Sequence, residues 1–243
     1  MSAAPALSVI LVCKNPGPRL HAALASVWAQ LHLHPEIIVI DGGSTDGSRE
    51  WLTAQRARLA TLVSAPDAGI YHAMNQGIAL ATGAWILFLG ADDRLVGDMV
   101  LSEALNWMNK TEAGVAAGEV AYDDGRIYKL RSNVNPCARN FVHHQGTFYR
   151  RSLFAENGSF EPELLTAADY EFQLRLWKGR VRFKPLPIRV AACGTHRPAA
   201  GPWIGWREEV AVRRRYFPLH RSLPWDALGL ARAAWRGLLP GRG

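Results

Sequence analysis

The chain has 243 residues, of which 49% are apolar and 20% charged, so it is an ordinary soluble globular protein with room for a sizeable core. Its formal charge of +7 gathers after Phe183, which indicates either a polyanionic partner or a solvated basic face. Three scattered cysteines argue against a disulfide framework or a structural zinc site, and for a reducing compartment. We find no signal peptide and no apolar stretch of about 18 residues, so we expect no membrane-spanning helix.

The first part of the chain alternates between strand-like and helix-like runs. Continuous apolar runs predict four buried strands, at 7–15, 36–43, 61–67 and 84–93. Apolar residues at helical spacing predict helices between them, at 18–31, 44–59 and 69–83. The first of these helices should carry Leu31 on its apolar side, and Gly83 should end the third. This alternation indicates parallel strands that are joined by crossover helices.

The second part of the chain has a different pattern. Residues 115–131 read as a hairpin whose turn is Asp-Asp-Gly, 146–151 and 181–193 as strands, and 166–179 as a helix. After Pro218 an appendage follows. As a helix it groups Leu228, Trp235, Leu238 and Leu239 on one arc, with Arg232 and Arg236 at its margin. A helix that lies on a membrane surface and a helix that packs on the core fit this pattern equally well.

Carboxylates follow three of the four predicted parallel strands. Asp41, Asp67 and the pair Asp92–Asp93 stand where these strands end. In open parallel sheets ligands bind at the carboxyl ends of the strands, so these residues should share one rim. Adjacent aspartates repel each other unless they separate or meet a cation. The rim therefore indicates a site for a cation or a nucleotide base, with Mg²⁺ or Mn²⁺ as the natural partner of such oxygens.

Several common nucleotide and hydrolase motifs are missing. The sequence has no GxGxxG after its first strand, no GxxxxGK[ST] and no GxSxG. A dinucleotide-binding site, a P-loop and an α/β-hydrolase elbow are therefore not indicated. What remains is an α/β sheet with a rim of carboxylates.

Five segments occur in a familiar order: SVILVCKN, EIIVIDGGSTDGS, DAGIYHAMNQGIALATGAWILFLGADD, HQGTFYRRSLF and AADYEFQLRL. Together they resemble the family 2 glycosyltransferases, and above all the bacterial enzymes of exopolysaccharide, capsule and O-antigen assembly. The resemblance covers about residues 7–217. It implies an α/β GT-A fold, a Rossmann-like and mostly parallel sheet flanked by helices, with a mixed acceptor-side half. It divides the chain into a transferase domain at 1–217, with halves at 7–95 and 96–217, and a basic amphipathic appendage at 218–243.

The resemblance also implies roles for the carboxylates of the rim. Asp41 would accept a hydrogen bond from the nucleotide base, and Asp67 would face the nucleotide. Asp92 and Asp93 fall on the Asp-x-Asp motif, whose first place is taken here by Gly90. Asp92 would bind the donor and the metal, with Asp93 beside it as a second metal ligand. Capping of a helix and a plain turn are the structural alternatives for Asp41 and Asp67.

The family places its catalytic carboxylate at Asp169. A direct displacement needs a base that takes the proton of the acceptor hydroxyl, and the start of a helix favours an ionised carboxylate. The alternative is a capping box that Thr166 forms with Asp169. For Arg175 we favour a structural ion pair with Glu171, four residues earlier on the same helix.

Further positions match the family less closely. The resemblance makes His144 and Gln145 candidates for contacts with the sugar, with a satisfied polar strand end as the structural alternative. It also makes His196 a candidate third metal ligand. Asn75 matches the family, either as a donor contact or as a tie between strand ends. His72 departs from it, since relatives carry Asp there.

These observations lead to one functional expectation. The chain should be an inverting, metal-dependent glycosyltransferase of cell-surface polysaccharide synthesis that uses Mg²⁺ or Mn²⁺. Its partners should be a nucleotide-diphospho-sugar donor, a lipid-linked saccharide acceptor and an anionic membrane surface, with no specific nucleic acid. We expect it in the cytoplasm or at the inner face of the cytoplasmic membrane. The alternatives are a sugar-nucleotide nucleotidyltransferase and a non-catalytic relative that binds nucleotides or nucleic acid.

Overall fold

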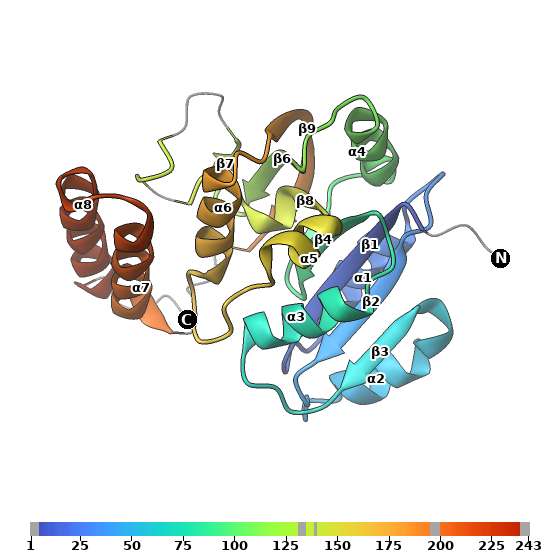
Figure 1. Ribbon diagram of the computed structural model, residues 1–243. Helices are drawn as coiled ribbons and strands as arrows, with labels where there is room; N and C mark the ends of the chain where they lie inside the picture. Colours follow the sequence, from blue (N-terminus) through green and yellow to red (C-terminus); the bar gives the residue numbers. More distant parts are fainter. Residues whose placement is uncertain (1–4, 131–134, 139, 195–199, 239–243) are drawn as a thin grey trace.

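The computed structural model describes residues 5–130, 135–138, 140–194 and 200–238 (Figure 1). A nine-stranded sheet has the order β3-β2-β1-β4-β8-β6-β9-β5, with β7 paired to β6. The strands are β1 (Leu7–Cys13), β2 (Glu36–Asp41), β3 (Thr61–Ser64), β4 (Trp85–Gly90), β5 (Arg94–Leu95), β6 (Val115–Tyr122), β7 (Ile127–Tyr128), β8 (Thr147–Arg150) and β9 (Phe183–Cys193). The helices are α1 (Arg19–Trp28), α2 (Ser48–Ala54), α3 (Ile70–Leu80), α4 (Val100–Met108), α5 (Ser152–Asn157), α6 (Ala168–Lys178), α7 (Gly201–Tyr216) and α8 (Leu219–Leu238).

The first half of the sheet is parallel, as the strand–helix alternation predicts. β1 pairs in parallel with β2 and β4, and β2 pairs in parallel with β3. Their carboxyl ends therefore lie along one edge. Beyond β4 the sheet becomes mixed, because β8 runs antiparallel to both β4 and β6, while β9 is parallel to β6. The predicted α/β class, with a mostly parallel half and a mixed half, is confirmed.

Two hydrophobic cores cover the two faces of the sheet. Leu24 of α1, Leu52 of α2 and Leu101 of α4 pack against one face. Met74 of α3 and Phe172 of α6 belong to the core on the other face. Strands that are buried on both sides need apolar residues at every position, which is why their sequences read as continuous runs.

Three local predictions need correction. α1 ends at Trp28, so Leu31 is 49% exposed and not part of an apolar helix face. α3 ends at Leu80, three residues before the predicted stop at Gly83. β9 begins at Phe183, two residues after the start of the predicted strand 181–193.

The predicted capping box at the start of α6 does not form. The Thr166 hydroxyl donates to Glu208 of α7 at 2.8 Å, and Ala167 is the N-cap residue. The same carboxylate accepts hydrogen bonds from the backbone N–H groups of Leu165, Thr166 and Ala167, at 2.7, 2.8 and 3.1 Å. A negative group suits this place, since the N-terminus of a helix carries partial positive charge. α7 therefore holds the chain segment that leads directly to Asp169.

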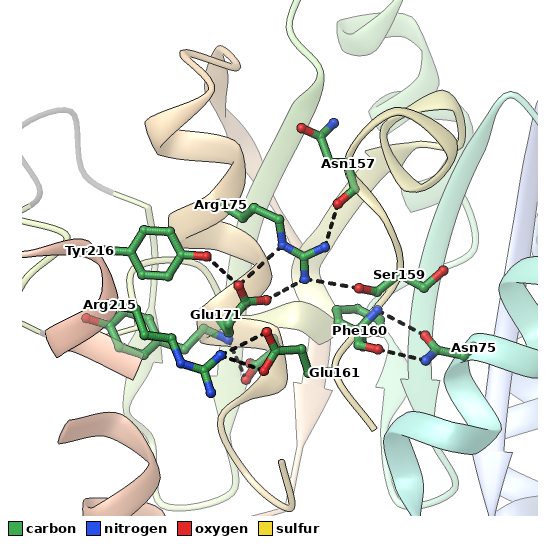
Figure 2. Close-up of polar contacts among 11 residues, drawn as sticks. Asn75, Asn157, Ser159, Phe160, Glu161, Glu171, Arg175, Arg215 and Tyr216 are labelled. Atoms are coloured by element: carbon green, nitrogen blue, oxygen red, sulfur yellow. Dashed lines mark hydrogen bonds and ion pairs between the residues drawn. The ribbon is translucent and has the colours of Figure 1, made fainter. Parts of the chain in front are cut away.

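A polar network anchors α6 on its other side (Figure 2). Arg175 forms an ion pair with the buried Glu171, as its spacing predicts, and also donates to the carbonyls of Asn157 and Ser159. The Tyr216 hydroxyl at the end of α7 donates to the same carboxylate of Glu171. The network joins α6 to α7 and to the segment after α5.

The last two helices form an antiparallel pair at one side of the molecule (Figure 1). The fully buried Arg213 of α7 donates to Asp226 of α8 at 2.8 Å, and the Trp206 ring N–H donates to the Asp226 carbonyl at 2.9 Å. One side of α8 is thus packed on α7, and the choice between a helix on the core and a helix on a membrane surface stays a prediction. In the described parts of the chain, no helix is both long enough and apolar enough to cross a membrane.

We expect Glu171→Gln to lower the free energy of unfolding by about 3 kcal/mol, because Arg175 would lose the counter-charge that offsets its partial burial. Urea denaturation measures this loss. The control is Glu112→Gln, since Glu112 and Arg182 form an exposed pair whose removal should have no measurable effect. Equal stability of the two variants would contradict a stabilising role for the network.

Candidate active site

Asp41 lies at the end of β2 and is fully buried. The Ser44 N–H and the Ser44 hydroxyl donate to its carboxylate, and the Ser64 hydroxyl donates at 2.6 Å. Both carboxylate oxygens are therefore engaged within the protein. The position of Asp41 at the rim agrees with the prediction, and its contact with a nucleotide base stays a prediction.

The carboxylate of Asp67 lies close to Gly42, the residue that follows Asp41. A Cβ atom on Gly42 would stand only 2.6 Å from an Asp67 carboxylate oxygen, so a side chain there would displace Asp67. The other oxygen accepts a hydrogen bond from the Gly69 N–H at 3.1 Å. The glycine after β2 thus allows two carboxylates from different strands to share one corner of the rim.

The adjacent Asp92 and Asp93 point to different environments. Asp92 is exposed, whereas Asp93 is 3% exposed and accepts a hydrogen bond from the Gly90 N–H at 2.7 Å. Burial raises the pKa of Asp93, and the charge of Asp92 adds to this, while the Cys193 thiol, the Gly90 N–H and the charge of His144 act in the opposite direction. The repulsion between the two carboxylates is relieved because one lies in solvent and the other in the protein.

Gly90 is necessary for this arrangement. A Cβ atom at position 90 would lie 2.8 Å from the Asp93 carboxylate and 3.1 Å from that of Asp92. The space that a first aspartate of the motif would enter is therefore occupied by Asp93. The departure from Asp-x-Asp and the inward turn of Asp93 are two parts of one local structure.

Asp169 is 7% exposed at the start of α6 and is surrounded by donors. Tyr71 of α3 and the Tyr170 N–H donate to one oxygen at 3.2 and 2.8 Å, and the Asn140 amide donates to the other at 2.7 Å. Burial alone would raise the pKa of Asp169, but His144, the Tyr170 N–H and Asn140 outweigh it and keep the pKa below its ordinary value. The carboxylate is therefore ionised at neutral pH.

His144 interacts both with Asp169 at the start of α6 and with the Asp92–Asp93 turn. Its Nδ1 lies 3.5 Å from the Asp169 carboxylate, and its charge also lowers the pKa of Asp93. Asp93 and Asp169 are 76 positions apart in the sequence. The fold nevertheless brings both carboxyl groups close enough to His144 for its charge to lower their pKa values.

Three buried polar atoms without partners belong to the segment that contains Asn140 and His144, two residues that contact Asp169. The Asn140 Oδ1, His143 Nδ1 and Gln145 Oε1 atoms have no hydrogen bond among the described residues. Burial, together with the charge of His144, lowers the pKa of His143 to about 3, so this ring is neutral. Unsatisfied buried polar atoms are uncommon in native proteins, and a polar ligand would satisfy these. Sequence reasoning identified His144 and Gln145 here and missed Asn140 and His143.

The remaining predicted residues lie farther from this cluster or outside the described residues. Asn75 donates to the Phe160 carbonyl at 2.8 Å and accepts from the Phe160 N–H at 3.1 Å, so it ties α3 to the segment before α6 (Figure 2). His72 lies 3.5 Å from Gln76, one turn later on α3. His196 lies outside the described residues. Tyr71, a neighbour of His72 in the GIYHAMN segment, reaches Asp169 and was not predicted to do so.

The residues at the rim fit a hard divalent cation in one specific way. In the described ranges, no three His, Cys, Asp or Glu side chains converge as a ligand set. Mg²⁺, however, usually binds one or two carboxylates together with water and substrate phosphates. The exposed Asp92 suits this mode, whereas the carboxylate of Asp93 is turned toward Gly90 and Cys193. The arrangement fits a cation that arrives with a phosphorylated substrate.

The comparisons with known proteins agree on one family. The model described as Glycosyl transferase family 2 matches residues 8–168. An uncharacterized glycosyltransferase of Mycobacterium tuberculosis is 33% identical over 250 residues, which cover 98% of this chain and 92% of that protein.

Two solved structures show the fold. S. aureus TarS 1–349 in complex with UDP-GlcNAc has a TM-score of 0.71 at 18% identity, over 93% of this chain and 72% of that one. In a longer TarS structure this chain spans 44% of the length. The mannosyltransferase PcManGT from Pyrobaculum calidifontis, in complex with GDP-Man and Mn²⁺, has a TM-score of 0.67 at 21% identity, over 98% of this chain and 78% of that one.

We expect Gly90→Ala to lower the free energy of unfolding by about 1–3 kcal/mol, because the new Cβ would push Asp93 away from its backbone donor and leave a buried carboxyl unpaired. Thermal or urea denaturation measures this change. The matched control is Gly205→Ala on α7, whose Cβ would meet only the Thr166 hydroxyl at 3.5 Å. If Gly90→Ala were as stable as this control, the close packing of Asp93 against position 90 would be wrong.

Proposed function

The chain belongs to glycosyl transferase family 2 and has the GT-A fold, and from this premise we propose that it is an inverting transferase with a nucleotide-diphospho-sugar donor and a lipid-linked saccharide acceptor. The observation that carries the proposal is the buried Asp169, which is kept ionised at the rim. The similar TarS and PcManGT structures contain UDP-GlcNAc and GDP-Man, which supports a nucleotide-sugar donor. Family membership favours sugar transfer over a nucleotidyltransferase or a non-catalytic relative.

In this proposal the donor lies over the ends of β1–β4. Asp67 is partly exposed at this corner and meets the nucleotide. The carboxylate of Asp41 is already engaged by Ser44 and Ser64, so Asp41 acts mainly by shaping the loop on which the base rests. Asn75 supports the site through the Phe160 backbone.

We propose that Asp92 holds Mg²⁺ or Mn²⁺ together with the diphosphate of the donor. When bound, such an ion neutralises the charge that develops on the leaving diphosphate. Asp93 keeps the turn in shape through its hydrogen bond with the Gly90 N–H, and so presents Asp92 to the rim. A ligand role for Asp93 or His196 remains a separate prediction.

Asp169 takes the proton of the acceptor hydroxyl as the new glycosidic bond forms. Tyr71 and Asn140 orient its carboxylate, and His144 stabilises its charge. The unpaired polar atoms of His143 and Gln145 belong to the two residues that flank His144 along the chain, and they suit a polyhydroxylated acceptor or sugar. One carboxylate that acts as a base suits a direct displacement, which inverts the anomeric carbon.

We further propose that the protein works in the cytoplasm, at the anionic inner face of the membrane, in the assembly of a cell-surface polysaccharide. The basic charge of the last quarter of the chain supports a surface with anionic lipids. No specific nucleic acid is required as a partner.

The donor and the metal are tested together by calorimetry with UDP-, GDP- and dTDP-sugars, with and without Mn²⁺ or Mg²⁺. We expect one class of donor to bind, and the metal to increase its affinity at least about tenfold through charge neutralisation. Asp92→Ala should remove this increase. Asp124→Ala, at the exposed tip of the β6–β7 hairpin, is the control and should retain it. Unchanged metal dependence in Asp92→Ala would exclude Asp92 as a ligand.

Asp169→Asn tests the base, because it preserves volume and removes the proton acceptor. We expect kcat to fall by about 10²–10⁴-fold, the usual contribution of a general base. The affinity for the donor should change little, since Asp169 faces the acceptor in this proposal. Glu163→Gln, an exposed residue of the preceding segment, should transfer sugar normally. Full turnover by Asp169→Asn would assign the base to another residue.

A further inference from the structure

α8 exposes an apolar face on the outside of the molecule. Its inner side, which includes Ser222 and Asp226, is buried against α7, while five large apolar residues on other sides are 41–68% exposed. These residues are Leu219, Leu223, Leu228, Leu230 and Trp235. Figure 1 shows α8 at the edge of the molecule, with α7 between it and α6.

The exposed apolar face is wider than a packing seam. With 3.6 residues per turn, Leu219 and Leu230 lie at one edge of this face and Leu228 lies at the other. The two edges are about 180° apart around the helix axis. Exposed alanines, Ala227 and Ala231, fill the middle of this arc, and His220 is the one ionisable side chain within it among the described residues. A helix that packs on a protein core needs an apolar stripe of only about 100°.

The charges around this face are positive. Arg221 and Arg232 lie along one margin of the arc. The single acid of the described part of α8, Asp226, is turned inward and paired with Arg213. An apolar face with arginines at its edge and no exposed acid complements an anionic lipid surface.

The face lies at the end of the molecule that carries Asp169. Trp206 of α7 donates to the Asp226 carbonyl, and a Cβ atom on Gly229 would lie 3.0 Å from the Trp206 ring, so the first half of α7 lies beside the middle of α8. Glu208, which follows the exposed Trp203 and Ile204 by between one and one and a half turns, holds the backbone that precedes Asp169. Trp203 at the start of α7 and Trp235 near the end of α8 are both exposed, and exposed tryptophans suit the boundary between lipid headgroups and acyl chains.

We propose that the outer face of α8, together with Trp203 and Ile204 of α7, docks on an anionic phospholipid surface with α8 in the plane of the headgroups. Docking would bring the Asp169 end of the molecule close to a lipid-linked acceptor. The delivery of a lipid-linked acceptor rests on the proposed function. The evidence that this face binds a membrane surface does not depend on that function. An antiparallel two-fold pair through this face is disfavoured, because it would place Arg221 and Arg232 of two copies at one seam.

The experiment is vesicle flotation of the full chain without donor, using phosphatidylcholine alone or mixed with phosphatidylglycerol. We expect binding to the anionic vesicles that weakens with salt. Leu223→Ser with Leu230→Ser should reduce it at least about tenfold through lost apolar burial. Arg221→Gln with Arg232→Gln should lower binding to anionic vesicles by about tenfold and leave binding to neutral vesicles unchanged.

The matched control is Leu31→Ser with Ile127→Ser, two residues that are 49% exposed outside the α7–α8 pair, and it should bind like the unchanged protein. Circular dichroism and donor affinity verify that each variant is folded, and they separate a failure of docking from a failure of the proposed function. Absence of vesicle binding would overturn the proposal. A dimer in light scattering that Leu223→Ser with Leu230→Ser converts to a monomer, without vesicle binding, would also overturn it and assign the face to a second copy.

Discussion

The site depends on keeping a buried carboxylate ionised. Removal of Asp169 from water disfavours its charge, and donors from three segments compensate: Tyr71 of α3, Asn140 and His144 of the segment before β8, and the backbone of α6. The same contacts join the parallel half of the sheet to the mixed half, so the two halves meet at the residue to which we assign the chemistry.

The helix that carries Asp169 is itself fixed from two sides. Glu208 satisfies the backbone donors just before the helix, and Glu171 with Arg175 ties its middle to neighbouring segments. Glu208 and Tyr216, which also contacts Glu171, both belong to α7. The position of the proposed base therefore depends on a helix more than 30 residues later in the chain. α8 in turn is held on α7 by Arg213 and Asp226, which links the proposed membrane surface to the site through direct contacts.

The sequence predicts the features that follow from local pattern and misses those that depend on distant partners. Buried parallel strands produce continuous apolar runs, so the rim formed by Asp41, Asp67 and Asp92 could be predicted. The capping box of Thr166 could not be excluded, because its competitor is a carboxylate 42 positions away. Asn140 lies in a segment without periodicity, and only the fold brings it to Asp169.

The Asp92–Asp93 turn shows how a departure from a family motif can be compensated within a few residues. Gly90 removes one carboxylate from the motif, and a side chain there would enter the space that Asp93 now occupies. Asp93 is bound by the Gly90 N–H and the Cys193 thiol, and burial raises its pKa, so its carboxyl group is turned into the protein and not toward the rim. One exposed carboxylate remains, that of Asp92. Since a phosphorylated donor brings its own oxygen ligands and negative charge, a single exposed carboxylate at this turn is consistent with a cation shared between protein and substrate.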